Sequence, residues 1–262
     1  APGVIDNIVL REANTPIAQA GEVIVEVAAV GLNFRDIMAA TSILPDEYDD
    51  ERAWWRNLGL ECSGIVRSVG EGVEHVRVGD RVMGMGKSYL RRFAVLPALA
   101  TMPVPDDVSL EDAATIPTAF ITAHYALAHV GRLAAGEKVL IHLGSGGVGL
   151  AAIQVARHIG AEVLTTAGSD EKRAHLKGLG IEHVMNSRSL DFAEDVLART
   201  GRGVEPRYRS VGGGLLERSR GRGTGREAQD RGQEPSGVGA EFHRFSMGRP
   251  VVTVGRRAWA AM

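Results

Sequence analysis

A chain of 262 residues with 44% hydrophobic residues, 24% charged residues and a formal net charge of −2 has the composition of a globular protein. Its near-neutral charge gives no reason to expect a nucleic-acid or membrane partner, and its single cysteine, Cys62, excludes an internal disulfide and a thiolate-rich zinc site. With no signal peptide and no apolar run of about 20 residues, a cytoplasmic location is expected.

The predicted N-terminal domain, residues 1–110, is mostly β. Its strands are the short β-branched runs at residues 8–10, 22–30, 61–69 and 78–84. Glycines and acidic turns separate these runs, which is typical of a compact barrel or sandwich. Residues 33–40 add a helical turn. Two helical pieces follow residue 110, with Ser109 as their N-cap and Gly131 as their stop.

Strands and helices alternate from residue 138 onward. The predicted strands are 138–144, 161–168 and 181–187, and the predicted helices are 147–159, 169–180 and 190–201. Alternation at this spacing is typical of right-handed βαβ units in a parallel sheet. Residues 111–205 are therefore predicted to form a doubly wound α/β domain of Rossmann type.

No fourth strand is expected after this alternation. The segment in its place reads VEPRYRSV, and Pro206, Arg207 and Arg209 do not suit a buried central strand. In the strand order 3-2-1-4-5-6, the loss of strand 4 leaves strand 1 unpaired at one edge. The Rossmann-type domain is therefore predicted to be incomplete.

Residues 206–262 differ in composition from the rest of the chain. They carry 11 Arg, no Lys and five acidic residues, and 22 of the 57 residues are Gly or Arg, whereas residues 1–205 carry 19 basic and 27 acidic residues. This composition predicts a disordered tail. Arg-Gly segments bind RNA, so a non-catalytic dinucleotide-binding module with an Arg/Gly interaction tail is one alternative. The tail's acidic residues favour the absence of a nucleic-acid partner.

The glycine-rich segment GSGGVG carries the clearest chemical signal. Gly144, Gly146 and Gly149 match G-x-G-x-x-G between an apolar strand and an apolar helix, which is the context of a dinucleotide-binding loop. Such a loop needs a tight turn at the first glycine, close approach to the pyrophosphate at the second and close helix packing at the third. The predicted pyrophosphate loop consists of Gly144, Ser145, Gly146, Gly147, Val148 and Gly149.

The residues after the second predicted strand favour NADPH over NADH. An NAD site places Asp or Glu there, whereas this chain has Gly168 and Ser169. Lys172, Arg173 and Arg188 follow, and small polar and basic groups suit a 2′-phosphate. In the alternative interpretation, Lys172 and Arg173 are solvated helix residues and Ser169 is only a cap.

No cluster of metal ligands stands out in the sequence. His124 and His129 are five residues apart and do not share a helical face, and Cys62 is interpreted as a small buried hydrophobic residue. We therefore expect no metal site.

Several motifs in a fixed order resemble the zinc-free medium-chain dehydrogenase/reductases. They are VAAVGLNFRDIMAA, LGLECSGIVRSVG, VGDRVMGM, IPTAFITAHYAL, VLIHLGSGGVGLAAIQVA and NSRSLDF. Within this superfamily, residues 2–205 are most similar to the enoyl-reductase domains of polyketide synthases and animal-type fatty acid synthases, which implies a GroES-like N-terminal domain. Zinc-dependent relatives carry Gly-His-Glu where this chain has Gly59, Leu60 and Glu61, and Leu60 cannot bind a metal.

The resemblance implies NADPH-dependent reduction of a 2-enoyl thioester on an acyl carrier protein. The hydride would go to the β-carbon and a proton to the α-carbon. The other domains of a multifunctional synthase and a second copy of the chain, in a homodimer, are the implied partners. A free-standing NADPH:quinone oxidoreductase of the same superfamily is the alternative within the enzyme class.

The resemblance also implies roles for individual residues. Ser169, Lys172 and Arg188 would surround the 2′-phosphate, and the loop described above would hold the pyrophosphate. Asn33 and Thr122 would lie near the nicotinamide end of the cofactor.

Catalytic residues are harder to assign from the resemblance. For Asn33 and Asp36, a catalytic role and a role in turn and cap chemistry both remain open. Leu44 stands where polyketide enoyl reductases have a tyrosine linked to the stereochemical outcome, and it has no proton to donate. The family's lysine and aspartate proton donors are not found, since Arg256 stands where the lysine is expected. We therefore expect a C-terminal part that is truncated or frame-shifted, and a chain with little activity and low stability.

Overall fold

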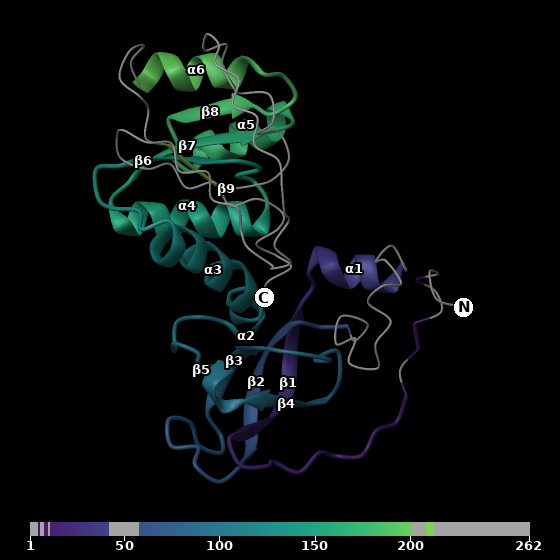
Figure 1. Ribbon diagram of the computed structural model, residues 1–262. Helices are drawn as coiled ribbons and strands as arrows, with labels where there is room; N and C mark the ends of the chain where they lie inside the picture. The colour runs from purple at the N-terminus through teal and green to yellow at the C-terminus, as the bar shows by residue number, and fades with distance from the viewer. Residues whose placement is uncertain (1–4, 6–7, 10, 42–57, 201–207, 212–262) are drawn as a thin grey trace, which may run out of the picture. The chain divides into compact units, whose positions relative to one another are not determined.

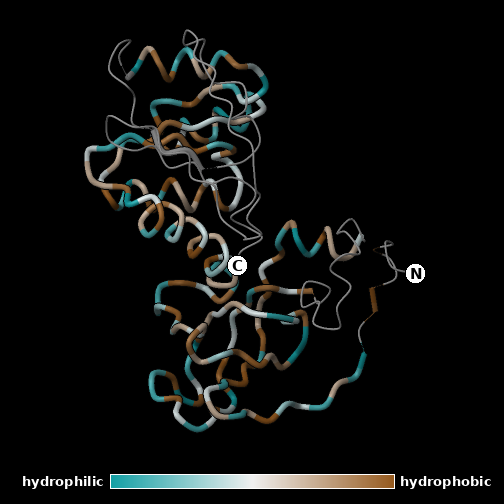
Figure 2. The backbone as a smooth tube through the Cα atoms, in the orientation of Figure 1, coloured by the Kyte–Doolittle hydropathy of each residue, from teal (hydrophilic) through white to brown (hydrophobic). Residues whose placement is uncertain are grey.

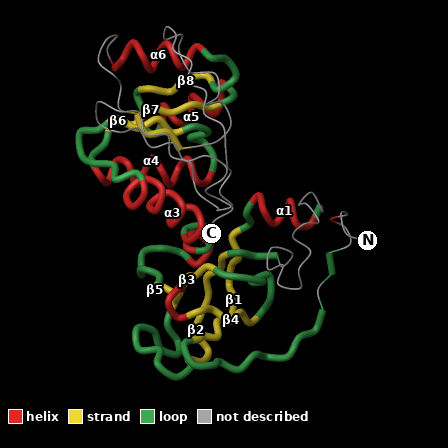
Figure 3. The backbone as a smooth tube through the Cα atoms, viewed as in Figure 1, coloured by secondary structure: helices red, strands yellow, loops and turns green. Residues whose placement is uncertain are grey.

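The computed structural model describes residues 5, 8–9, 11–41, 58–200 and 208–211. They belong to two compact units, residues 1–119 and 120–262. Strands dominate the first unit, whereas strands and helices alternate in the second (Figures 1 and 3). The predicted class, a mostly-β part followed by a Rossmann-type part, is confirmed.

The first unit is built on an antiparallel sheet of five strands in the order β4-β1-β2-β3-β5. Its strands are β1 (Glu22–Gly31), β2 (Glu61–Val69), β3 (Arg81–Met85), β4 (Phe93–Pro97) and β5 (Thr101–Pro103). The sequence analysis did not predict β4 and β5. The strand predicted at 8–10 is wrong, because Ile8 and Val9 lie outside any strand. No described strand pairs with Ile8 or Val9, so no ladder hydrogen bonds offset the ordering of their backbone.

The core of this unit is filled by small and β-branched side chains from its strands. Its buried members include Val23, Val25, Val66, Val82, Ala94 and Leu96. Cys62 belongs to the same cluster and is fully buried. Burial first, and the neighbouring charge of Glu61 second, raise the pKa of the Cys62 thiol to about 12. Cys62 is therefore a protonated core residue, as predicted, and not a nucleophile.

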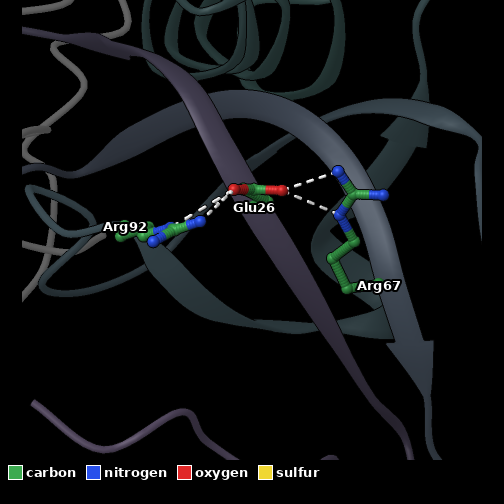
Figure 4. Close-up of polar contacts among 3 residues, drawn as sticks. All are labelled: Glu26, Arg67 and Arg92. Carbon is green, nitrogen blue, oxygen red and sulfur yellow. Dashed lines mark hydrogen bonds and ion pairs between the residues drawn. The ribbon is translucent and has the colours of Figure 1, made fainter.

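An ion-paired carboxylate joins three segments at the surface of this sheet. Glu26 on β1 accepts hydrogen bonds from Arg67 on β2, at 2.6 and 2.8 Å, and from Arg92 beside β4, at 3.2 and 3.3 Å (Figure 4). The hydrogen bonds from Arg67 and then from Arg92 lower the pKa of Glu26. The two arginines are exposed, and surface ion pairs contribute little to stability, so we expect little stabilisation from this cluster.

Three short helical segments complete the first unit. They are α1 (Phe34–Ala40), the 3₁₀ turn η4 (Ala98–Ala100) and α2 (Leu110–Ala113). The Ser109 hydroxyl caps α2 by accepting from the backbone N–H of Asp112, as predicted. The helix α3 (Pro117–His124) begins in this unit, and the chain continues as a π-helical run, Tyr125–Val130, that ends at Gly131.

The second unit contains a parallel sheet of four strands in the order β8-β7-β6-β9. Its strands are β6 (Lys138–Ile141), β7 (Glu162–Ala167), β8 (His183–Asn186) and β9 (Tyr208–Val211), and its helices are α4 (Gly147–Ile159), α5 (Asp170–Gly178) and α6 (Asp191–Thr200). Apolar and polar residues alternate along α6 (Figure 2). Its apolar residues, Phe192 and Val196, pack with Leu140, Leu164 and Met185 of the strands.

The strand β9 corrects the prediction that no fourth strand forms. It pairs in parallel with β6, from Lys138 opposite Tyr208 to Ile141 opposite Val211, so β6 has a neighbour on each side. The strand begins at Tyr208, after Pro206 in the sequence, so the missing N–H of the proline does not fall in the ladder. The order β8-β7-β6-β9 is the 3-2-1-4 order of a Rossmann-type sheet.

Candidate functional site

The glycine-rich segment connects the carboxyl end of β6 to the amino end of α4. Gly146 is the N-cap of α4, with extended backbone dihedrals, and its carbonyl accepts from the N–H of Leu150 at 2.8 Å. The first backbone N–H groups of a 13-residue helix therefore follow the loop directly. Such a helix end binds phosphate through its unpaired N–H groups and its dipole. The sequence predicted this strand, loop and helix in the order in which they occur.

Three glycines of the loop differ in what an added Cβ would meet. A Cβ at Gly144 would overlap the Thr165 hydroxyl oxygen, and a Cβ at Gly149 would overlap the Leu143 carbonyl oxygen and lie 2.7 Å from the Gly144 Cα. A Cβ at Gly146 would meet only the Leu143 carbonyl oxygen, at 3.4 Å, which the fold tolerates. Packing therefore explains Gly144 and Gly149, whereas Gly146 is free for close approach of a ligand.

The tight turn before the loop falls on a residue other than the predicted one. Leu143 has a positive φ of 55°, whereas Gly144 does not have a positive φ. A non-glycine residue in the left-handed region is strained by about 1–2 kcal/mol. The Leu143 side chain is 58% exposed, so packing does not compensate for this strain. Gly144 instead serves the close contact with Thr165.

His142 precedes this turn and is largely buried. Its Nδ1 lies 3.2 Å from the Thr166 hydroxyl, and its ring meets the edge of Phe192 at a centroid distance of 5.3 Å. Burial lowers the pKa of His142. The imidazole is therefore neutral near pH 7 and helps to pack α6 next to β6.

Acidification is expected to destabilise the second unit through His142. Because the folded-state pKa is lowered, the unfolded chain binds a proton more readily. The stabilisation is complete above the unfolded pKa of 6.5 and is lost as the pH falls from there toward the folded pKa. Thermal melts between about pH 7.5 and about pH 5 should show a smaller fall in Tm for His142→Asn than for the unsubstituted chain. Equal falls would assign the pH dependence to other groups.

The predicted 2′-phosphate residues lie at the carboxyl ends of β7 and β8. Ser169 is the N-cap of α5 and accepts from the N–H of Lys172. The guanidinium of Arg188 lies across Gly168, so close that a Cβ at Gly168 would be 2.9 Å from Arg188 Nε. The side chains of Lys172 and Arg188 are exposed, and no described carboxylate forms an ion pair with either. The structure thus brings Arg188 to the position where an NAD site carries its acid.

Arg173, in contrast, is engaged in the fold. Its Nη2 lies 2.5 Å from Asp170, and its Nη1 donates to the Ala167 carbonyl at 3.1 Å. The side chain is 19% exposed. Neither sequence interpretation, a solvated residue or a phosphate ligand, describes this arginine.

A second cluster of polar groups lies in the first unit around Glu61. The Glu61 carboxylate is 3% exposed and accepts from Asn33 Nδ2 and from the Thr118 backbone N–H, each at 2.8 Å. A Cβ at Gly31 would lie 2.6 Å from Glu61 Cγ, so a glycine is needed opposite this side chain. The hydroxyl of Thr118 is buried and has no hydrogen-bond partner among the described residues.

Asp36 also has a structural set of partners. It is 6% exposed, and its two oxygens accept from the backbone N–H groups of Asn33, at 2.8 Å, and Gly59, at 2.9 Å. These bonds cap α1 and anchor the chain at Gly59, which favours the cap interpretation of Asp36. Asn33 is both the N-cap residue of α1 and the partner of Glu61.

The remaining predicted residues are less informative. Thr122 lies on α3 in the second unit and is 8% exposed, whereas Asn33 belongs to the first unit. Leu44 and Arg256 lie outside the described residues. Leu60 is buried, and no group of three or more His, Cys, Asp or Glu side chains that could hold a metal occurs in the described part of the chain.

Sequence reasoning missed the role of Glu61. It identified Glu61 only as the last residue of a motif that has lost its histidine. A usable signal was nonetheless present, because a charged residue opens strand β2, at the buried end of that strand, and pairs in register with Gly31 on β1. A buried carboxylate must be hydrogen-bonded, and such a pair indicates where its partners lie.

Comparison with known families agrees with this geometry. Residues 19–106 match the alcohol dehydrogenase GroES-like domain, and residues 147–219 match the zinc-binding dehydrogenase family. The two matches and the two-part fold define a medium-chain dehydrogenase/reductase. The second match extends into the segment predicted to be a tail outside the family.

Individual relatives define the family more closely. The chain is 40% identical over 218 residues to a phenolphthiocerol/phthiocerol polyketide synthase of Mycobacterium tuberculosis, covering 83% of this chain and 10% of that protein. It matches the crystal structure of CurK enoyl reductase with a TM-score of 0.73 and 40% identity, over 81% of this chain and 64% of that one. It also matches the crystal structure of JamJ enoyl reductase, with a TM-score of 0.69 and 32% identity, over 80% of this chain and 72% of that one. The chain belongs to the enoyl-reductase domains of polyketide synthases, as its motifs predicted.

The chain spans only a small part of the synthases it matches: 10% of the phenolphthiocerol/phthiocerol synthase subunit and 6% of an erythronolide synthase of Saccharopolyspora erythraea. Among the described residues, no helix is long and apolar enough to cross a membrane.

Proposed function

We propose that this chain reduces the double bond of a 2-enoyl thioester carried by an acyl carrier protein, with NADPH as the reductant. The observation that carries the proposal is the glycine loop at the start of α4 together with Arg188 at Gly168, which forms no ion pair with a described carboxylate, in a chain whose relatives are polyketide synthases. NADPH supplies a hydride to the β-carbon, and the α-carbon then takes a proton from solvent or a donor group, which leaves a saturated thioester and NADP⁺.

Residues of the second unit supply the groups for both phosphate-binding parts of the proposed cofactor site. The N–H groups at the start of α4 face the pyrophosphate, and Gly146 lets the backbone approach it. Ser169, Lys172 and Arg188 receive the 2′-phosphate. Asn33 and Thr122 remain predictions for the nicotinamide end.

The reaction is tested by following the label from deuterated NADPH. With crotonyl pantetheine and protein in stoichiometric amounts, the expected product is butyryl pantetheine with one deuterium at the β-carbon, identified by mass spectrometry and NMR. Stoichiometric protein makes the test independent of the turnover rate. If the label appears in no thioester product although NADPH is bound, the proposed reaction is wrong.

The turnover of this chain is expected to be slow. The sequence contains no lysine after residue 206, so the family's lysine proton donor has no counterpart there. General acid catalysis accelerates a reaction about 10²–10⁴-fold. Without it, the kcat of this chain is expected to lie below a typical kcat of about 10 s⁻¹ by about that factor. Absorbance at 340 nm measures it, and NADPH oxidation with crotonyl thioester at a typical enzyme rate would contradict the expectation.

A quinone reductase is the second candidate function. The structure of a mycobacterial quinone oxidoreductase matches with a TM-score of 0.69 and 32% identity over 81% of this chain. Parallel assays with a quinone and with crotonyl pantetheine separate the two, because only the enoyl reductase gives a labelled thioester. The relatives that are synthases favour the thioester.

The partners follow from the same assignment. We propose that the chain works beside the other domains of a synthase, in the cytoplasm and as a homodimer. Size-exclusion chromatography with light scattering tests the dimer directly.

A further inference from the structure

One asparagine connects the two arginines at the carboxyl ends of β7 and β8. Asn186, the last residue of β8, accepts two hydrogen bonds at its Oδ1, from the backbone N–H of Arg188 at 2.9 Å and from Nη1 of Arg173 at 3.3 Å. Both groups that face it are donors, so the amide oxygen must be the atom that points toward them. Asn186 thus holds the turn that carries Arg188.

Arg173 fixes the other side of Asn186. Besides Asn186, it donates to the Ala167 carbonyl at 3.1 Å and pairs with Asp170 at 2.5 Å. The same Ala167 carbonyl accepts from the N–H of Ser187 at 3.1 Å. Strand β7, helix α5 and the turn after β8 are therefore tied together around one amide, and the charge of Arg173 is already balanced by Asp170.

Arg188 is the arginine that remains available. Its guanidinium lies across Gly168, where an added Cβ would be 2.9 Å from Nε, 3.3 Å from Nη2 and 3.4 Å from Cζ. Only a glycine leaves room for the arginine in this position. An acid at residue 168, as in an NAD site, would occupy the same space.

We propose that Asn186 is the positioning residue of the site: it holds Arg188 across Gly168 so that the guanidinium meets the 2′-phosphate of NADPH. The inference rests on the proposed function, because it presumes NADPH as the cofactor. Asn186 acts through Arg188 and does not itself contact the phosphate. Gly168 and Asn186 then contribute to the preference for NADPH over NADH through the position of Arg188.

The test measures the affinity for NADPH and for NADH separately, by nicotinamide fluorescence titration of the full chain. A charge-assisted hydrogen bond contributes enough that Arg188→Ala is expected to weaken NADPH binding about tenfold, with NADH binding unchanged. Asn186→Ala should have the same selective effect. The double variant should be no weaker than Arg188→Ala alone, because Asn186 acts only through that arginine. Lys177→Ala, an exposed cation at the other end of α5, is the charge control and should change neither affinity.

Gly168→Ala provides a second variant that leaves the hydrogen bonds of Asn186 in place. The atoms that its Cβ would meet belong to the far end of a flexible, exposed side chain, so the fold should tolerate the change. Displacement of Arg188 should again weaken NADPH binding about tenfold and leave NADH binding unchanged. Unchanged Tm values for all three single variants, Arg188→Ala, Asn186→Ala and Gly168→Ala, exclude a general loss of structure.

Different outcomes overturn different statements. If the unsubstituted chain binds NADPH and NADH equally, the NADPH assignment in the proposed function is wrong, and the inference with it. The chain could prefer NADPH while Asn186→Ala keeps that preference or weakens the binding of both cofactors equally. In that case the positioning role of Asn186 is wrong, and the NADPH assignment stands. A double variant clearly weaker than Arg188→Ala would likewise contradict the positioning role.

Discussion

Replacing Gly149 with alanine is expected to destabilise the second unit by about 3 kcal/mol, as overpacking against rigid atoms does. The added Cβ would overlap the Leu143 carbonyl oxygen and lie 2.7 Å from the Gly144 Cα and 2.8 Å from the Gly144 carbonyl carbon. All three atoms belong to the backbone, so no side chain can rotate away. To make room for the added methyl group, the loop would have to move away from the start of α4.

The neighbouring glycines serve as matched controls for this variant. Gly147→Ala meets no atom within 4 Å, and alanine favours the first turn of a helix, so stability should stay the same or rise slightly. Gly146→Ala should leave stability unchanged but weaken NADPH binding, because its Cβ would enter the space that the proposed cofactor site assigns to the pyrophosphate.

Urea denaturation followed by circular dichroism, together with NADPH titration, distinguishes the three variants. Gly149→Ala should lower the unfolding midpoint, Gly146→Ala only the affinity, and Gly147→Ala neither. Equal unfolding midpoints for Gly149→Ala and Gly147→Ala would show that the loop adapts, and the packing argument for Gly149 would be wrong. Unweakened NADPH binding by Gly146→Ala would place the pyrophosphate elsewhere.

The sequence predicted the parts of the second unit that depend on local pattern. The pattern of apolar residues predicts strands β6, β7 and β8 and the helices that follow them. The spacing of its glycines predicts the glycine loop. Strand β9 was missed because its existence depends on pairing with β6, about 70 residues earlier in the chain, and not on its own composition. Local propensity argued against the segment that contains Pro206, but the ladder begins only at Tyr208.

The candidate sites show the same limit. Gly168 and Arg188 are visible in the sequence as a missing acid and a cation, but only the structure shows the guanidinium lying across the glycine and Asn186 holding the turn. The donors that surround Glu61 lie 28 and 57 residues away, so no local pattern reveals them. In the motif where zinc-dependent relatives carry Gly-His-Glu, Glu61 is a buried hydrogen-bond acceptor.

The role of Glu61 leads to the second large effect: Glu61→Ala should destabilise the first unit by about 3 kcal/mol, since it removes two hydrogen bonds to a charged acceptor. One of the two donors, the Thr118 N–H, is then left at the start of α3 without its partner, and Asn33 loses the contact that fixes its amide. The carboxylate also sits favourably at the amino end of that helix.

Glu61→Gln separates charge from shape in this prediction. The glutamine fills the same space beside Gly31, but one of its two polar atoms is an NH₂ group, which can accept from neither Asn33 nor Thr118. We expect Glu61→Gln to lower the free energy of unfolding by less than Glu61→Ala does. We also expect the Asn33 side-chain amide signals to shift in ¹⁵N NMR spectra. Glu26→Gln changes a half-buried carboxylate on the neighbouring strand whose arginine partners are exposed; it is the control and should have little effect on the urea midpoint. If Glu61→Ala unfolds at the same urea concentration as Glu26→Gln, the two buried hydrogen bonds do not stabilise the unit, and Glu61 is retained for another reason.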